Sequence, residues 1–188
     1  MLIKICGITD CRSAQVVEQA GADFIGLVFA PSKRQVTRAT AQQIAAVTTL
    51  PLVGVFVNEA VATINELVAS VPLAYVQLHG NETAAIAQQI HAPIIKAFTK
   101  AEPITPFPAV YTLIDNIQAG TGTPYDYQQV ALQSNSFLAG GISLTTIDSA
   151  LACKPCGIDV SSGVETNGQK DAKKIHELIS YVRSQTNV

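Results

Sequence analysis

Eight short apolar segments recur along this chain, and stretches with helical patterning separate most of them. The segments span residues 2–6, 24–28, 52–57, 74–78, 94–97, 110–115, 136–139 and 157–160. Strands that alternate with helices are typical of βαβ units, whose strands lie parallel in one sheet. Eight such strands predict an α/β protein with a closed (β/α)₈ barrel, the TIM-barrel architecture.

The first residues of six helices are predicted from side chains that cap helix N-termini, which are mainly Asp, Asn, Ser and Thr. The predicted caps and helices are Asp10 before 11–20, Thr40 before 41–48, Asn58 before 59–70, Asn81 before 82–90, Ser143 before 144–152, and Asp171 before a helix that runs to about residue 183. Gly21 is expected to end the first of these helices.

The length of 188 residues is short for such a barrel, because about 200 residues is the usual lower limit. Residues 98–108 read FTKAEPITPFP and contain three prolines. Since proline interrupts helix interiors, a loop is predicted in place of the fifth helix. The alternative is an open, doubly wound sheet, but the glycine-rich turn typical of that fold does not follow the first segment. No linker divides the sequence, so residues 1–188 are predicted to form a single barrel domain.

The charge and the apolar runs of the chain indicate which kinds of partner it does not bind. Charged residues make up 14% of the chain and the net charge is −2, so no basic stripe indicates nucleic acid. The apolar runs, such as residues 24–30, are far shorter than the ~20 residues of a membrane helix. The N-terminus does not resemble a signal peptide, because strand-like residues begin at Leu2. We expect a cytoplasmic protein that binds neither nucleic acid nor membranes.

Four cysteines are present, and two of them, Cys153 and Cys156, have C-x-x-C spacing. This spacing serves redox chemistry or half of a zinc site. No second C-x-x-C or H-x-x-x-H motif supplies the remaining zinc ligands. We interpret the pair as part of a loop between a helix and a strand, and we predict no metal.

The alternation of side chains along a strand predicts which residues enter the barrel. In the first segment, Ile3 and Ile5 suit packing against helices, which leaves Lys4 and Cys6 pointing inward. Barrel enzymes carry their chemistry at the C-terminal ends of the strands. The same reasoning places four polar side chains at one mouth of the barrel: Cys6, His79, Asp115 and Asp159.

Each of these residues also has a purely structural interpretation. A buried cysteine is often an inert small hydrophobe. His79 is able to form a local hydrogen bond, and Asp115 is able to cap the following turn. Asp159 is able to neutralise Lys4 inside the barrel, where a charge needs a partner.

Two loops at the same mouth suit an anion. Gly140 and Gly141 follow the seventh segment, and Ser161 and Ser162 follow the eighth. Glycines allow the backbone to approach a ligand closely, and free N–H groups bind phosphate oxygens. The loops after strands seven and eight hold a phosphate in many barrels. The sequence therefore predicts a phosphate site there.

Seven motifs in order along the chain resemble the phosphoribosylanthranilate isomerase family of tryptophan biosynthesis. They are KICGIT (4–9), GADFIGLVF (21–29), VGVFVN (53–58), VQLHGNE (76–82), IKAF (95–98), LAGGIS (138–143) and DVSSGVE (159–165). The resemblance implies an Amadori rearrangement of N-(5-phosphoribosyl)anthranilate to 1-(2-carboxyphenylamino)-1-deoxyribulose 5-phosphate. It implies no metal and no organic cofactor.

The resemblance also assigns roles to residues. It implies that Cys6 is the general base, that Asp115 is the general acid, and that Arg34 binds the anthranilate carboxylate. Lys33 and Arg38 are alternatives to Arg34. It implies that Gly140, Gly141, Ser161 and Ser162 bind phosphate; His79 and Asp159 are predicted to face the substrate. A free thiol titrates near ~8.5, so the base needs activation, for which Lys4 is the nearest candidate.

Two stretches depart from the family pattern. Residues 119–122 read AGTG where the family usually has GGTG, and Tyr127 stands where tryptophan is common. These changes bear on how the loop after the sixth strand closes.

Three other functions fit the residues less well. They are another phosphosugar isomerase or epimerase, a non-catalytic barrel that binds a phosphorylated metabolite, and a thiol redox protein that uses Cys153 and Cys156. The expected partner is a small phosphorylated aminosugar, and the assembly is a monomer or a homodimer.

Overall fold

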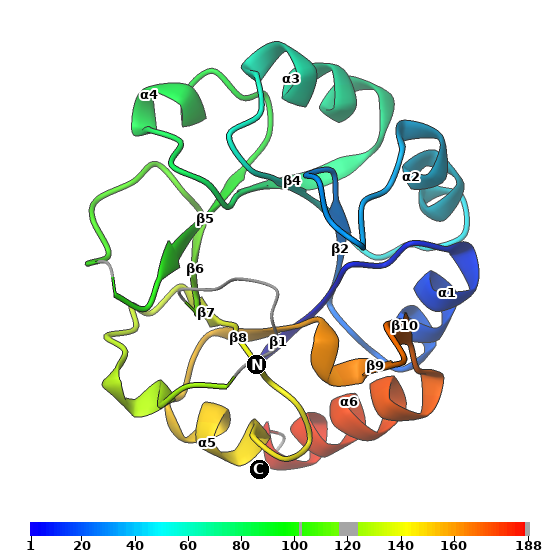
Figure 1. Cartoon of the computed structure of the whole chain (residues 1–188), viewed down its shortest axis with the longest axis vertical. Coiled ribbons are helices and arrows are strands. Elements are labelled where there is room, and N and C mark those ends of the chain that lie inside the picture. Colours follow the sequence, from blue (N-terminus) through cyan, green and yellow to red (C-terminus); the bar gives the residue numbers. More distant parts are fainter. Residues whose placement is uncertain (102, 117–123, 187–188) are drawn as a thin grey trace.

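The computed structural model describes residues 1–101, 103–116 and 124–186. Eight parallel strands close into a barrel in sequence order, from β1 next to β2 round to β8 next to β1 (Figure 1). The strands are β1 (Leu2–Cys6), β2 (Phe24–Val28), β3 (Leu52–Phe56), β4 (Leu73–Leu78), β5 (Ile94–Thr99), β6 (Tyr111–Asp115), β7 (Ser136–Leu138) and β8 (Gly157–Val160). The predicted (β/α)₈ fold is therefore confirmed.

Helices surround the barrel on its outside (Figure 1). They are α1 (Cys11–Gln19), α2 (Arg38–Ala45), α3 (Val61–Ser70), α4 (Ala84–Ala87), α5 (Ile147–Ala152) and α6 (Ala172–Thr186), with short 3₁₀ turns η1 (Tyr127–Gln129) and η2 (Ser162–Val164). A small hairpin of β9 (Glu165–Thr166) and β10 (Gln169–Lys170) precedes α6. In the described part of the chain, no helix is both long and apolar enough to cross a membrane.

The first and last helices begin where they were predicted. The Asp10 carboxylate accepts a hydrogen bond from the Ser13 amide, at 2.8 Å, and so caps α1. Asp171 accepts from the amides of Lys173 and Lys174 at the start of α6. Gly21 follows α1 with a φ of +88°, in the left-handed region that favours glycine.

The four other predicted caps are wrong by two to three residues. Thr37, and not Thr40, caps α2, and Thr83, and not Asn81, caps α4. Asn58 lies two residues before the α3 cap position, Ala60, and its side chain accepts from the Asn81 amide instead. Ser143 likewise precedes α5, where its own amide donates to Thr146 Oγ1. A different local threonine therefore caps α2 and α4, whereas Asn58 is engaged by a contact with another loop.

The connection between β5 and β6 is a loop, as the prolines predicted. Residues 100–101 and 103–110 contain no helix. Phe107 of this loop lies over the ammonium of Lys96, 5.7 Å from Nζ to the ring centroid. A second connection is also reduced, because residues 116 and 124–135, between β6 and β7, carry only the single turn η1.

Two apolar clusters support the barrel. The larger one packs the outward faces of the strands, including Ile3 and Ile5, against the helices. The smaller one fills the inside of the barrel, where Phe24 meets Phe137 edge to face with ring centroids 6.0 Å apart. As predicted, Lys4 is then left on the inner face, buried above this cluster. Lys4, Asp115 and Asp159 thus bring charged groups to the inside of the barrel on the side nearest the C-termini of the strands.

Candidate active site

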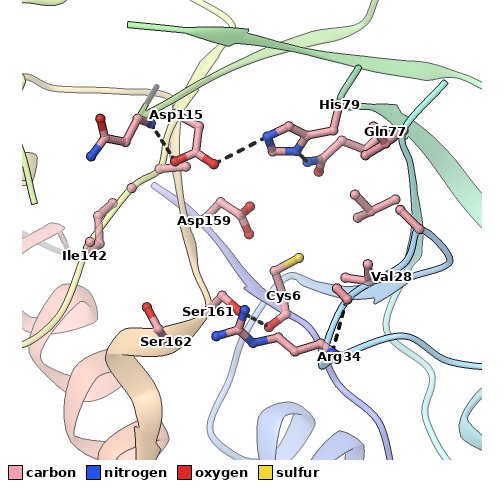
Figure 2. Close-up of a pocket in the computed structure, with 18 of the residues that line it drawn as sticks. Cys6, Val28, Arg34, Gln77, His79, Asp115, Ile142, Asp159, Ser161 and Ser162 are labelled. Carbon is pink, nitrogen blue, oxygen red and sulfur yellow. Dashed lines mark hydrogen bonds and ion pairs between the residues drawn. The ribbon is translucent and has the colours of Figure 1, made fainter. Parts of the chain in front are cut away.

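A cavity of about 200 Å³ opens at the C-terminal ends of the strands. All nine residues predicted for the site line it: Cys6, Arg34, His79, Asp115, Gly140, Gly141, Asp159, Ser161 and Ser162. Figure 2 shows those other than the two glycines. Apolar side chains such as Val28 and Val55 complete its wall. The cavity therefore combines a thiol, two carboxylates, an imidazole and a guanidinium in one small space.

Cys6 ends β1, and its side chain faces the cavity from a buried position. Gly26 on the neighbouring strand makes room for it, because a Cβ there would lie 2.8 Å from Cys6 Sγ. Burial raises the pKa of the Cys6 thiol above its ordinary value, and the nearby Lys4 charge offsets this only in part. The predicted activation by Lys4 is therefore outweighed by desolvation in the free protein.

Lys4 and Asp159 form a buried ion pair below the thiol. Lys4 Nζ lies 2.9 Å from Asp159 Oδ1, and the Lys4 side chain is 1% exposed. Burial alone would lower the pKa of Lys4, but the charges of Asp159 and Cys6 together raise it. Asp159 thus has both predicted features, since it neutralises Lys4 and lines the cavity.

Asp115 ends β6 and is held from two sides. Its Oδ1 accepts a hydrogen bond from the Asn116 amide, at 2.7 Å, and its Oδ2 lies 3.4 Å from His79 Nε2. The other ring nitrogen of His79, Nδ1, is 2.8 Å from the side-chain nitrogen of Gln77. This contact links the His79 ring to Gln77, whose Oε1 is buried without a hydrogen-bond partner among the described residues. Figure 2 shows the three side chains in a row along one wall of the cavity.

The two loops that contain the predicted phosphate-binding glycines and serines meet in the cavity wall beside this row of side chains. Gly140 has a φ of +88°, and a Cβ at this position would lie 2.9 Å from Asp115 Oδ1. A Cβ on Gly163 would collide with the carbonyl oxygen of Ile142, so the loops after β7 and β8 touch through glycine. The Ser161 hydroxyl donates to the carbonyl of Cys6, at 3.0 Å, and ties this wall to the end of β1.

Tyr127, which departs from the family pattern, supports the same wall. It is 2% exposed, and its hydroxyl donates to the carbonyl of Gly140, at 2.7 Å. Both tyrosine and tryptophan carry a donor at the end of a large apolar side chain. The other departure, residues 119–122, lies outside the described residues.

Of the three basic residues predicted for carboxylate binding, the structure places only Arg34 in the cavity wall. The Lys33 side chain is 62% exposed, and Arg38 lies on the surface beside Glu66. Arg34 pairs with Glu165 through two hydrogen bonds, from Nε at 2.6 Å and from Nη2 at 3.0 Å. Sequence reasoning gave Glu165 no role, although Thr166-Asn167-Gly168-Gln169 after it has the Asn-Gly signature of a tight hairpin.

Cys153 and Cys156 lie away from this site. Cys153 follows the end of α5 and Cys156 precedes β8, as the predicted loop requires. Burial raises the pKa of both thiols, that of Cys156 to about 11, and this disfavours thiolate chemistry. Among the described residues, no group of three or more His, Cys, Asp and Glu side chains is arranged to hold a metal ion.

Comparisons with known proteins identify the family of the chain. Residues 3–181 match the family N-(5'-phosphoribosyl)anthranilate (PRA) isomerase. The N-(5'-phosphoribosyl)anthranilate isomerase of Oceanobacillus iheyensis is 43% identical over 200 residues, which cover 97% of each chain. That of Listeria welshimeri is 38% identical over 195 residues, which cover 95% of this chain and 96% of the relative.

Solved structures match the fold as well. Phosphoribosyl anthranilate isomerase from Thermus thermophilus superposes with a TM-score of 0.89 at 32% identity, over 98% of this chain and all of the other. A second isomerase structure holds reduced 1-(o-carboxyphenylamino)-1-deoxyribulose 5-phosphate. It has a TM-score of 0.80 at 30% identity, over 98% of this chain and 99% of the other. The chain therefore belongs to the phosphoribosylanthranilate isomerase family, the isomerases of tryptophan biosynthesis.

Proposed function

We propose that the chain performs the isomerisation of its family with Cys6 as the general base and Asp115 as the general acid. The observation that carries the proposal is that one cavity holds both groups, from strands on different sides of the barrel, with a glycine- and serine-lined wall beside them. A proton donor and a proton acceptor at separate places suit a reaction with two proton transfers on one sugar.

The first step opens the furanose ring. Asp115 donates a proton to the ring oxygen as the bond between that oxygen and C1 breaks, and the nitrogen lone pair forms a Schiff base at C1. The His79 ring, whose Nε2 lies 3.4 Å from Asp115 Oδ2, faces the carboxylate that remains, and Gln77 contacts the other side of the ring.

The second step moves a proton from carbon. The Schiff base acidifies the hydrogen on C2, and Cys6 removes it as a thiolate to give an enolamine, which tautomerises to the ketone. Lys4 supplies a positive charge that favours the thiolate. Asp159 keeps Lys4 charged at this position.

The two ends of the substrate are fixed by different residues of the cavity wall. Backbone amides of Gly140 and Gly141, together with Ser161 and Ser162, are suited to the 5-phosphate, because successive N–H groups form a concave anion site. Arg34 is suited to the anthranilate carboxylate, which a guanidinium binds with two parallel hydrogen bonds.

Asp115→Asn tests the acid. Since an amide cannot supply the acidic proton, we expect kcat to fall by ~10²–10⁴-fold with little change in KM. The decay of the anthranilate fluorescence of the substrate, generated in the cuvette, measures both constants. Asp126→Asn is the matched control, because Asp126 is a nearby aspartate on the outside of the barrel that caps η1. A near-normal kcat in Asp115→Asn contradicts the acid role, provided that the wild type is active.

We also propose that the enzyme acts in the cytoplasm as a monomer or homodimer. Four free cysteines and a phosphorylated pathway intermediate as substrate support this location. One solved relative, from Thermotoga maritima, is described as a monomer made from a dimeric isomerase, so both assemblies are compatible with the fold.

A further inference from the structure

The Arg34 guanidinium reaches the site from one loop and is held by a carboxylate from another. Arg34 lies between β2 and α2, and Glu165 lies after β8, 131 residues further along the chain. Their two hydrogen bonds use the Nε and Nη2 edge of the guanidinium. Arginine has five N–H donors, so three remain for a ligand. Arg34 lines the cavity, whereas Glu165 and Lys170 are not part of the described lining.

A tight hairpin places Glu165 at this point. Asn167 and Gly168 have φ values of +52° and +78°, which match the two central residues of a type I′ turn. The turn fixes the register of β9 and β10, in which Glu165 lies directly opposite Lys170. Lys170 Nζ then donates to Glu165 Oε1, at 2.9 Å, and to the carbonyl of Ser161, also at 2.9 Å.

The charges in this cluster leave it attractive to an anion. Glu165 is one carboxylate between two cations, Arg34 and Lys170, with Lys33 Nζ 3.8 Å away as a third. Burial alone would raise the pKa of Glu165, but the hydrogen bonds and charges of Arg34 and Lys170 lower it to about 2. Glu165 is therefore ionised at neutral pH, and its charge does not cancel that of the whole group.

We propose that Glu165, braced by Lys170, is a positioning residue that presents Arg34 to the carboxylate of the substrate. It acts through Arg34 and does not touch the substrate itself. Because Lys170 also holds Ser161, the hairpin fixes the carboxylate end and the phosphate wall relative to each other. This inference rests on the proposed role of Arg34, and the experiment separates the two.

The test compares two substrates that differ only in the carboxylate. Glu165→Gln keeps the shape of the side chain but replaces one acceptor by a donor, so it cannot accept both hydrogen bonds of Arg34. We expect kcat/KM for N-(5-phosphoribosyl)anthranilate to fall by roughly 10- to 100-fold, because small displacements of a binding group have effects of this size. For N-(5-phosphoribosyl)aniline, which lacks the carboxylate, we expect a change within about twofold. Chromatography of the products measures both rates.

Three controls keep the result unambiguous. Glu66→Gln removes a similar carboxylate from an exposed arginine, Arg38, and should leave kcat/KM unchanged for both substrates. Glu165→Asp retracts the carboxylate but keeps its charge, and it replaces Glu165→Gln if that variant does not fold. Its kcat/KM should also fall more for N-(5-phosphoribosyl)anthranilate than for N-(5-phosphoribosyl)aniline. Arg34→Ala tests whether Arg34 binds the substrate carboxylate. It should lower kcat/KM only for the substrate that carries this carboxylate.

An equal fall of kcat/KM for both substrates in Glu165→Gln would mean that Glu165 only stabilises the barrel, and an unchanged kcat/KM would mean that it has no role. If Arg34→Ala discriminates between the substrates and the Glu165 variants do not, the positioning claim alone is wrong. If Arg34→Ala does not discriminate either, the carboxylate role of Arg34 fails first.

Discussion

Cys6 combines two opposing influences on one sulfur atom. Burial raises the pKa of the thiol, and the Lys4 charge and hydrogen bond lower it by a smaller amount. In the free enzyme the thiolate fraction therefore grows only as the pH rises above the ordinary value, near ~8.5. We predict that alkylation of Cys6 by iodoacetamide, followed by mass spectrometry of the N-terminal peptide, accelerates through a midpoint above that value.

Cys11, which lies half-exposed at the start of α1, provides an internal control that the reagent stays active in each sample. A Cys6 midpoint at or below neutral pH would show that Lys4 outweighs burial, contrary to the balance described here.

Sequence reasoning at the residue scale succeeded where the strand period decided the outcome. Alternation along the first strand was enough to place Lys4 and Cys6 inside the barrel and Ile3 and Ile5 outside. Glu165 was different, because its partner lies 131 residues away and the contact depends on the hairpin and the barrel being closed. The residues around Glu165 in the sequence do not indicate which distant residue it contacts.

At the scale of elements, the loops after β7 and β8 approach each other so closely that glycine is required. A Cβ on Gly163 would meet the carbonyl of Ile142, which is backbone and cannot move aside cheaply. Gly163→Ala should therefore separate the loops, raise KM and weaken inhibition by inorganic phosphate. We expect a loss of stability of about 1–3 kcal/mol as well, typical of overpacking.

Gly21→Ala is the matched control, in the connection between α1 and β2. Gly21 has a φ of +88° but no heavy atom within 4 Å of an added Cβ. The substitution should strain its turn by about 1 kcal/mol while the inhibition constant of inorganic phosphate stays unchanged. If the two variants change the inhibition constant of phosphate equally, the close contact between the loops after β7 and β8 does not determine phosphate binding.

The elements themselves were predicted unevenly. Strand positions agree with the sequence to within two residues, since continuous apolar runs mark strands that are buried on both faces. Helix starts were less accurate, because several polar residues compete for the cap and tertiary contacts choose among them. Asn58, for example, binds Asn81 across two loops and leaves Ala60 before α3 without a side-chain cap.

For the whole molecule, the Lys4–Asp159 pair joins the first strand to the last and so closes the barrel. The two residues are register partners in β1 and β8. Lys4→Met leaves Asp159 buried without its partner, and the free energy of unfolding should fall by about 3–5 kcal/mol in urea titrations. The double variant with Asp159→Leu removes both charges and should recover most of this loss.

The exposed pair of Arg38 and Glu66 serves as control, because Arg38→Met should change the free energy of unfolding by at most about 1 kcal/mol. A similarly small effect of Lys4→Met would contradict the closure role.

The stability of the whole molecule should also depend on acid through Glu165. Its pKa is about 2 in the folded chain and near 4.5 when unperturbed, so between these values the unfolded chain binds a proton that the folded chain does not. The stabilisation is therefore complete above pH 4.5 and is lost as the pH falls toward 2. Urea unfolding at pH 6 and pH 3 should show a wild-type advantage over Glu165→Gln that shrinks at the lower pH. A constant difference would mean that Glu165 is not held by its cationic neighbours.

The most direct test of the account is the turnover of Cys6→Ala, beside Cys11→Ala as a matched thiol. Each protein is added to phosphoribosylanthranilate generated in the cuvette, and the fall in anthranilate fluorescence gives kcat and KM. Cys6→Ala should lose ~10²–10⁴-fold in kcat with KM nearly unchanged, whereas Cys11→Ala should match the wild type. Near-normal turnover of Cys6→Ala would contradict the assignment of the base, and with it the central claim about this cavity.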